Sequence, residues 1–269
     1  MSQKGHGMKP IFHIASLFLW TVSFLHADLL QTILENKTLK VCIWPEYYSI
    51  SYVNPRTQKL TGIDVDLAKR LAQTLDVQPL FVSSSFATLI QDVTTHRCDI
   101  AMFAVGQTPA REKYLRFTSP HLMSDIYAIA SKSNRRITTW DDIDQEGVVV
   151  AVAKGTYHVE VMQQSLQKAK LLIVDTLHAR EQEVQAGRAD VFMTDYPFGI
   201  QLLHETAWAK LIAPTVPFHK TYYGWALSKE SDANSFFQKV EQFMQTIKRD
   251  GTLLETARHY QLDPIVVTE

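Results

Sequence analysis

The chain has 269 residues, of which 46% are hydrophobic and 20% charged, and its formal net charge at pH 7 is -1. A chain of this length and composition folds as one large globular domain or as two smaller lobes. Because the net charge is near zero and the lysines and arginines are scattered, neither nucleic acid nor an anionic membrane surface is expected as a partner.

Residues 1–27 are predicted to be a cleavable secretory signal peptide. Lys4 and Lys9 precede an apolar run over residues 11–25, which ends near the small residue Ala27. A membrane anchor is the alternative, but about fifteen apolar residues interrupted by His13 are short for a spanning helix of about twenty. No cysteine stands at the cleavage point, so a lipid-anchored mature form is not expected.

In the first part of the mature chain, short apolar runs alternate with segments whose apolar residues recur at helical spacing. This alternation predicts a parallel sheet covered by helices on both faces. The expected elements are a helix over 29–35, a strand over 39–44, a helix over 65–75, a strand over 80–82, a helix over 86–95 capped by Ser85, and a strand over 99–103.

A second series of similar size begins after Asp141 and Asp142, which indicate a turn or a helix start. It predicts another α/β unit. The expected elements are a strand over 148–153, a helix over 159–168, a strand over 171–174, a helix over 179–187, a strand over 189–194, and a helix over 197–205.

The chain is expected to cross between the two series through 127–131 and to return through 222–228, before helices over 234–248 and 253–260. If the two crossings lie side by side, they form a two-strand hinge. The predicted organisation is a first lobe that begins with 28–125, a second lobe at 126–221, and a return to the first lobe with the C-terminal helices at 222–269. Ligands bind at the carboxyl ends of strands in such sheets, so a site is expected between the lobes.

An anion site is predicted directly after the strand over 99–103. Thr108 is expected to cap a short helix, Pro109 suits its first position, and Arg111 falls in its first turn. The free N–H groups of that turn and the Arg111 guanidinium can converge on one carboxylate. The alternative is a surface ion pair between Arg111 and Glu112 or another neighbour.

Asp195 ends a predicted strand of the second lobe, where its carboxylate can accept hydrogen bonds from an ammonium group. Arg111 and Asp195 on opposite lobes suit a zwitterion such as an α-amino acid, whose buried charges must both be paired. The alternative for Asp195 is to cap the helix that begins near Pro197.

Further candidate binding residues lie in the loops at strand ends. Tyr47 and Phe86 can form flat apolar walls, although aromatic residues at such positions also serve in ordinary cores. Glu46 can favour a cationic ligand such as lysine or arginine, or it can be solvated. The loops Gly106–Arg111 and Gly155–Tyr157 complete the set.

Cys42 and Cys98 both fall at predicted strands. They can bridge in an oxidising compartment, but two apolar strand positions are interpreted as packed, reduced thiols. The cysteines and histidines show no metal-binding spacing, so no metal site and no cofactor is expected.

Five segments carry a resemblance to the family 3 periplasmic solute-binding proteins, the amino-acid-binding components of ABC importers. They are TGIDVDLAKRLAQTL, CDIAMFAVGQTPARE, LRFTSPHL, AKGTY and GRADVFMTDYPFG, and the resemblance runs from about Leu29 to Gly251. It implies a bilobal Venus-flytrap α/β fold, with two parallel-sheet lobes joined by a two-strand hinge.

The resemblance also implies roles for individual residues. Arg111 matches the arginine that binds the α-carboxylate, and Asp195 matches the aspartate that binds the α-amino group. Tyr47 falls where a stacking aromatic is frequent, and Thr156, beside Tyr157, falls where a hydroxyl helps to hold the carboxylate. Gly106 replaces a frequent serine, so a contact there would use its backbone N–H.

The expected protein is therefore a monomeric periplasmic amino-acid-binding protein that docks on an ABC permease of the inner membrane. A ligand-sensing partner of a signalling receptor is an alternative.

An enzymatic branch of the same superfamily, cyclohexadienyl dehydratase, is a second alternative, which the chain resembles in LQTILENKTLKV and FATLIQDV. The dehydratase pattern Gly-Gly-Thr-Asn-Glu ends in a glutamate that acts as general acid. Val159 occupies that position, and Glu160 lies one residue later, turned by about 100° around a helix. His158 can in principle donate a proton, but it is interpreted as a solvated residue. The acid is expected to be absent, and the protein is expected not to be an enzyme.

Overall fold

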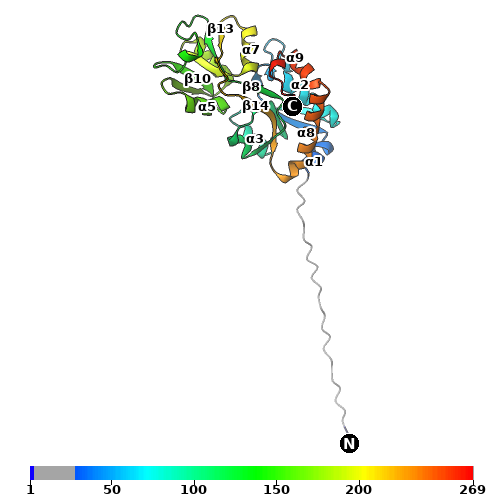
Figure 1. Ribbon diagram of the computed structural model, residues 1–269. Coiled ribbons are helices and arrows are strands. Elements are labelled where there is room, and N and C mark those ends of the chain that lie inside the picture. The colour runs from blue at the N-terminus through cyan, green and yellow to red at the C-terminus, as the bar shows by residue number, and fades with distance from the viewer. Residues whose placement is uncertain (3–27, 269) are drawn as a thin grey trace.

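The computed structural model describes residues 1–2 and 28–268. They form two α/β lobes (Figure 1), and the chain leaves the first lobe, builds the second, and returns to the first. The predicted signal peptide falls almost wholly on residues 3–27, outside the described residues. None of the helices within 28–268 combines the length and the apolar character that crossing a bilayer requires.

The first lobe is built on a sheet in the order β5-β1-β6-β14-β7, with β8 paired to β14. β1 is parallel to β5 and β6, whereas β14 runs antiparallel to its neighbours. The strands are β1 (Thr38–Ile43), β5 (Gln78–Ser83), β6 (Ile100–Gly106), β7 (Leu115–Phe117), β8 (Leu122–Ser124) and β14 (Thr221–Ser228). A small separate sheet contains β2 (Glu46–Tyr47), β3 (Ser51–Val53) and β4 (Leu60–Thr61).

The helices of the first lobe come from both ends of the chain. They are α1 (Leu29–Glu35), α2 (Ile63–Thr74), α3 (Leu89–Thr94), α4 (Pro109–Glu112), α8 (Asn234–Arg249) and α9 (Thr252–His259), and Figure 1 shows α8 and α9 beside α1 and α2. Short 3-10 turns are η2 (Ser231–Ala233) and η3 (Asp263–Ile265).

The second lobe is built on a sheet in the order β11-β10-β12-β9-β13. Its strands are β9 (Tyr127–Ser131), β10 (Val149–Ala153), β11 (Lys170–Val174), β12 (Val191–Thr194) and β13 (Ala209–Ile212). Its helices are α5 (Tyr157–Ser165), α6 (Leu177–Gln185) and α7 (Tyr196–Glu205), and η1 (Trp140–Asp142) is a 3-10 turn. β10 is parallel to β11 and β12, as predicted, whereas β9 runs antiparallel to β12 and β13, so each sheet has a parallel part and antiparallel additions.

The two segments predicted to form the hinge lie in different sheets. β9 belongs to the second sheet and β14 to the first, so they do not pair with each other. β14 pairs instead with β8, with Thr221 opposite Ser124. The chain therefore changes sheets at 125–126 and again at 213–220, in each case just before the predicted segment.

Asp64 of α2 fixes the strands that lead to the site between the lobes. Its buried carboxylate accepts hydrogen bonds from the backbone N–H of Ala104 at 2.7 Å and from the indole N–H of Trp225 at 2.8 Å. Ala104 lies on β6 and Trp225 on β14, and a hydrogen-bonded carboxylate is the tolerable form of a buried charge. These contacts tie both strands to α2.

Two sequence expectations next to the site were corrected by the structure. α3 begins at Leu89 instead of Phe86, and its N-cap is Thr88, without a side-chain capping bond, instead of Ser85. Phe86 therefore lies in the turn before the helix.

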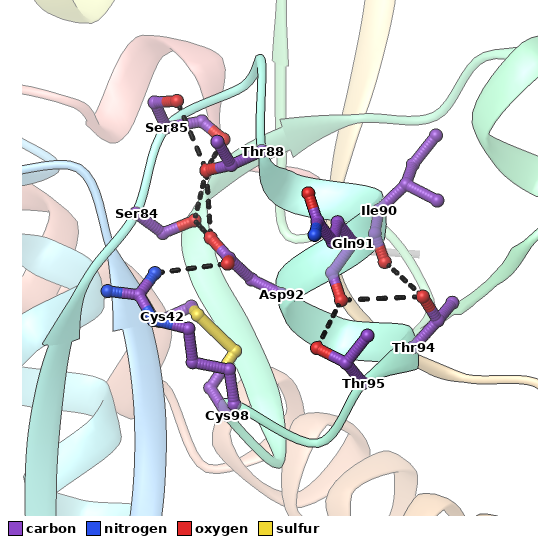
Figure 2. A network of polar contacts seen from close by, with 11 residues as sticks. Cys42, Ser84, Ser85, Thr88, Ile90, Gln91, Asp92, Thr94, Thr95 and Cys98 are labelled. Carbon is purple, nitrogen blue, oxygen red and sulfur yellow. Dashed lines mark hydrogen bonds and ion pairs between the residues drawn. A yellow bond between two sulfur atoms is a disulfide. The ribbon is translucent and has the colours of Figure 1, made fainter.

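Cys42 and Cys98 form a disulfide, and the interpretation of two reduced thiols was wrong. β1 and β6 are neighbours in the sheet, which brings the two Cα atoms to 5.5 Å, within the range that a disulfide spans. Figure 2 shows the disulfide beside Asp92, whose carboxylate accepts hydrogen bonds from Ser84 at 2.6 Å and from Thr88 at 2.8 Å. The bridge and this network together tie β1, β5 and α3.

Removal of the disulfide is expected to destabilise the protein by about 4 kcal/mol, because a bridge across this sequence separation of 56 residues limits the unfolded chain. The measurement is chemical denaturation of the Cys42→Ala/Cys98→Ala double variant. Wild type in a reductant that releases both thiols is expected to lose a similar free energy of unfolding. An unchanged midpoint in the fully reduced protein would contradict this account.

Candidate functional site

Arg111 lies at the boundary between the lobes and donates to both. Its Nη1 donates to the carbonyl of Gly106 at 2.8 Å in its own lobe, and its Nη2 donates to the carbonyl of Gly155 at 3.0 Å in the second lobe. The guanidinium lies over the ring of Phe86, with Cζ 4.9 Å from the ring centroid. Arg111 is 6% exposed and forms no ion pair within the described part of the chain, so the alternative of a surface pair with Glu112 is wrong.

The local sequence places Arg111 as predicted. The Thr108 hydroxyl accepts a hydrogen bond from the Arg111 backbone N–H at 3.4 Å, and Pro109 occupies the first turn of α4. The strand that leads to it, β6, is buried along its whole length. The buried strand β6 thus positions Arg111 at the boundary between the lobes.

Asp195 combines the two roles that the sequence left open. Its Oδ1 accepts from the backbone N–H of Phe198 at 3.3 Å, which caps α7. Its Oδ2 accepts hydrogen bonds from the hydroxyls of Tyr47 and Tyr223, the latter at 2.8 Å. Tyr47 and Tyr223 belong to the first lobe and Asp195 to the second, so the carboxylate also joins the lobes.

Aromatic side chains connect Arg111 with Asp195. Tyr157 lies beside Arg111, since a methyl group on Gly106 would be 3.3 Å from atoms of both side chains. The Tyr157 and Tyr223 hydroxyls lie 3.2 Å apart, and Tyr223 reaches Asp195. On another side, the Phe86 and Tyr47 ring centroids lie 5.9 Å apart. The structure therefore brings the predicted arginine, aspartate and aromatic residues into one site.

Burial dominates the electrostatics of the site. It lowers the pKa of Arg111 to about 10, which still leaves a cation at neutral pH. It raises the pKa of Asp195, while hydrogen bonds from Tyr47 and Tyr223 and the nearby charge of Arg180 act in the opposite direction. The phenol pKa values of Tyr47 and Tyr223 are raised well above 10 by burial and by Asp195. Both tyrosines are thus neutral hydrogen-bond donors.

The remaining predicted residues contribute in different ways. The buried Thr156 hydroxyl donates to the carbonyl of Ala153 at 2.7 Å and keeps lone pairs free to accept. Gly106 offers its carbonyl to Arg111, where the sequence suggested its N–H. Glu46 on β2 has one buried carboxylate oxygen, Oε2, with no hydrogen-bond partner.

Two residues of the site were missed or misjudged from the sequence. Arg180 on α6 is 2% exposed, lies over the rings of Phe192 and Phe198, and donates to the carbonyl of Met193 at 2.6 Å. His158 was interpreted as solvated, but it is buried, and neither ring nitrogen has a hydrogen-bond partner. Burial, with the charges of Arg180 and Arg111, lowers the pKa of His158 well below 6.5, so the ring is neutral.

Comparison with known proteins shows the family to which this chain is related. The model of the bacterial extracellular solute-binding proteins, family 3, matches residues 39–263. The chain belongs to this family. Its bilobal fold and the resemblance recognised in its motifs are both confirmed.

Individual relatives of this solute-binding protein have different named activities. Cyclohexadienyl dehydratase of Pseudomonas aeruginosa is 29% identical over 236 residues, which cover 86% of this chain and 85% of that protein. The L-cystine-binding protein TcyJ of Escherichia coli is 27% identical over 232 residues, with coverage of 86% and 85%. The crystal structure of the ancestral amino acid-binding protein AncCDT-1, a precursor of cyclohexadienyl dehydratase, superposes with a TM-score of 0.78 at 28% identity, covering 86% of this chain and 98% of that one.

Gly155 is expected to be essential for contact between the lobes. A methyl group at this position would lie 2.4 Å from the backbone N of Ala87 in the other lobe, and the backbone φ is +77°. Gly155→Ala is therefore expected to hold the lobes apart, with a larger radius of gyration in small-angle X-ray scattering.

Gly187→Ala is the matched control for this prediction. Its φ is +69°, but nothing lies within 4 Å of the added methyl group. Both variants are expected to lose about 1–2 kcal/mol of stability from the left-handed backbone, and only Gly155→Ala is expected to expand. Equal radii of gyration for the two variants would count against this role of Gly155.

Proposed function

We propose that this solute-binding protein binds a free α-amino acid between its lobes. The observation that carries the proposal is that buried Arg111 and buried Asp195 lie on opposite lobes of one site and that each makes hydrogen bonds across the boundary. An α-amino acid presents a carboxylate and an ammonium group a short distance apart, and each pole finds an opposite charge here.

In the proposed complex the ligand carboxylate pairs with the Arg111 guanidinium, supported by the Thr156 hydroxyl. The ligand ammonium pairs with Asp195 in place of one tyrosine hydroxyl. Phe86 and Tyr47 enclose the ligand from the first lobe, and Tyr157 encloses it from the second. Closing the lobes removes water from both ion pairs, which strengthens them.

We also propose the biological setting that the family implies. The signal peptide 1–27 directs the chain to the periplasm, and the two crossings between the sheets act as the hinge between lobe 1 and lobe 2. The closed, liganded form docks as a monomer on the permease of an ABC importer. Presentation of the ligand to a signalling receptor would use the same site and the same closure.

A dehydratase activity is the second candidate, and the 29% identical relative favours it. Two features of the site argue against it. Glu160, the nearest carboxylate in sequence to the position of the dehydratase acid, is exposed on α5. His158 is buried and neutral, so at neutral pH it lacks the imidazolium form that would serve as a general acid. Binding without catalysis therefore fits the site better.

Replacement of Arg111 tests the proposal. A thermal-shift screen of the amino acids identifies a ligand, and calorimetry then measures its affinity for wild type and for Arg111→Ala. Loss of a buried charge partner is expected to cost about 2 kcal/mol or more, which is at least about thirtyfold in Kd. Exposed Arg70→Ala is the control that changes the same charge elsewhere. Unaltered affinity in Arg111→Ala would refute the assignment.

Asp195→Asn separately tests the ammonium pole. Asparagine keeps the size and the helix cap but loses the charge. The variant is expected to bind the amino acid at least about tenfold more weakly. Its affinity for the analogue that lacks the amino group is expected to stay at the wild-type value. If wild type binds the amino acid and its deaminated analogue equally, Asp195 does not bind an ammonium group.

The dehydratase alternative is tested with prephenate, which is included in the thermal-shift screen. Formation of phenylpyruvate from prephenate would establish the dehydratase instead.

A further inference from the structure

Two carboxylates lie on contacting elements on either side of the boundary between the lobes, outside the Arg111 and Asp195 pair. Glu46 lies on β2 of the first lobe and Glu181 on α6 of the second, and these two elements are in contact. The Glu181 side chain is 7% exposed and accepts no hydrogen bond within the described residues. Oε2 of Glu46 is buried and has no hydrogen-bond partner. Buried carboxylate oxygens without donors are rare and costly in a folded protein.

No cation among the described residues forms a hydrogen bond with either carboxylate. The nearest basic group to Glu181 is the imidazole of His178, with Nδ1 3.9 Å from Oε1, but that side chain is 63% exposed and charged only when protonated. Arg180 precedes Glu181 on α6 and its charge acts on Glu181, but its hydrogen bonds go to Met193 and Thr194. The buried Glu181 side chain and the buried Oε2 of Glu46 thus lack a hydrogen-bonded partner among the described residues.

Aromatic side chains line the same place. The Tyr48 ring lies 4.5 Å from the Tyr52 ring and 4.9 Å from the Phe198 ring, measured between centroids, and Phe198 belongs to the second lobe. Burial raises the phenol pKa of Tyr48, and the charge of Glu181 raises it further, so the two groups are close enough to interact. Carboxylates beside aromatic faces are the surroundings in which organic cations are bound in proteins.

The position of the pair links it to closure of the lobes. Contact between β2 and α6 brings two like charges together as water leaves, which opposes the closed state. The pKa of the Glu181 carboxyl is raised, as expected for a buried acid near a like charge. Burial and the neighbouring Glu46 raise this pKa, while Arg180 and His178 lower it. A cation placed between the carboxylates would convert this repulsion into two attractions.

We propose that Glu46 and Glu181 form a subsite for a cationic group, so that the lobes close fully only on an amino acid whose side chain ends in an ammonium or guanidinium group. This inference rests on the proposed amino-acid binding. It adds the class of ligand and the two residues that select it.

The test compares ligands that match in shape and differ in charge. Calorimetry measures the binding of arginine against citrulline and of lysine against norleucine to the wild-type protein. At least about tenfold tighter binding of the cationic member of a pair is expected. Equal affinity within both pairs would overturn the cation subsite and leave amino-acid binding intact, because all four ligands carry the same α-carboxylate and α-amino groups.

Variants assign the selectivity to the two residues. Glu46→Gln, Glu181→Gln and the double variant are expected to bind arginine at least about tenfold more weakly and citrulline with little change. Glu183→Gln is the control on the same helix, since Glu183 pairs with Arg188 and its side chain carries the same charge, and it is expected to keep the wild-type selectivity. A double variant that folds, as judged by its melting temperature, and still prefers arginine over citrulline would refute the assignment.

Agmatine separates this inference from the function on which it rests. It carries the guanidinium of arginine without the α-carboxylate, so it is expected to bind at least about tenfold more weakly than arginine because Arg111 loses its partner. If agmatine binds as tightly as arginine and the double variant weakens both, the cation subsite stands and the α-carboxylate role of Arg111 falls.

Discussion

The arrangement of the whole site depends on one buried, unpaired cation. Arg111 is 6% exposed, and its charge meets two backbone carbonyls, one from each lobe, and the face of Phe86. Carbonyl dipoles and an aromatic face offset only part of the cost of burying a full charge. The largest gain available to this closed arrangement is therefore an anion that reaches Arg111 from between the lobes.

Other buried polar atoms without partners lie in the same region. They include Nε of Arg180, both ring nitrogens of His158, the hydroxyl of Thr221 and Oε2 of Glu46. Thr221 adjoins Gly106, and the charge of Arg180 acts on both Asp195 and His158. A native core satisfies nearly all such groups, so their concentration at the boundary supports the proposal of a site that exchanges hydrogen bonds with a polar solute.

The sequence predicted those parts of the fold and site that local chemistry determines. The extents of α1 and α7, the Thr108 cap, and the strand that leads to Arg111 follow from periodicity and capping preferences. Arg180 could not be recognised, because the segment Ala179–Glu183 has the charged composition of a solvated helix face and only packing against Phe192 and Phe198 buries it. The disulfide was not predicted because it depends on β1 and β6 becoming neighbours in the sheet. The hinge was misplaced because the local sequence does not determine which sheet β9 and β14 join.

The tyrosines on Asp195 determine what a ligand ammonium gains. Tyr47 and Tyr223 already donate to Oδ2 in the closed arrangement, so an arriving ammonium exchanges one hydrogen bond for another instead of capturing a bare carboxylate. The net gain is then the difference between a neutral donor and a cationic donor in a dry site. Such an exchange recognises charge more than hydrogen-bonding capacity. It also moderates the affinity, because the tyrosines can return as the ligand leaves, and the proposed delivery of the solute to a permease needs a site that releases as well as captures.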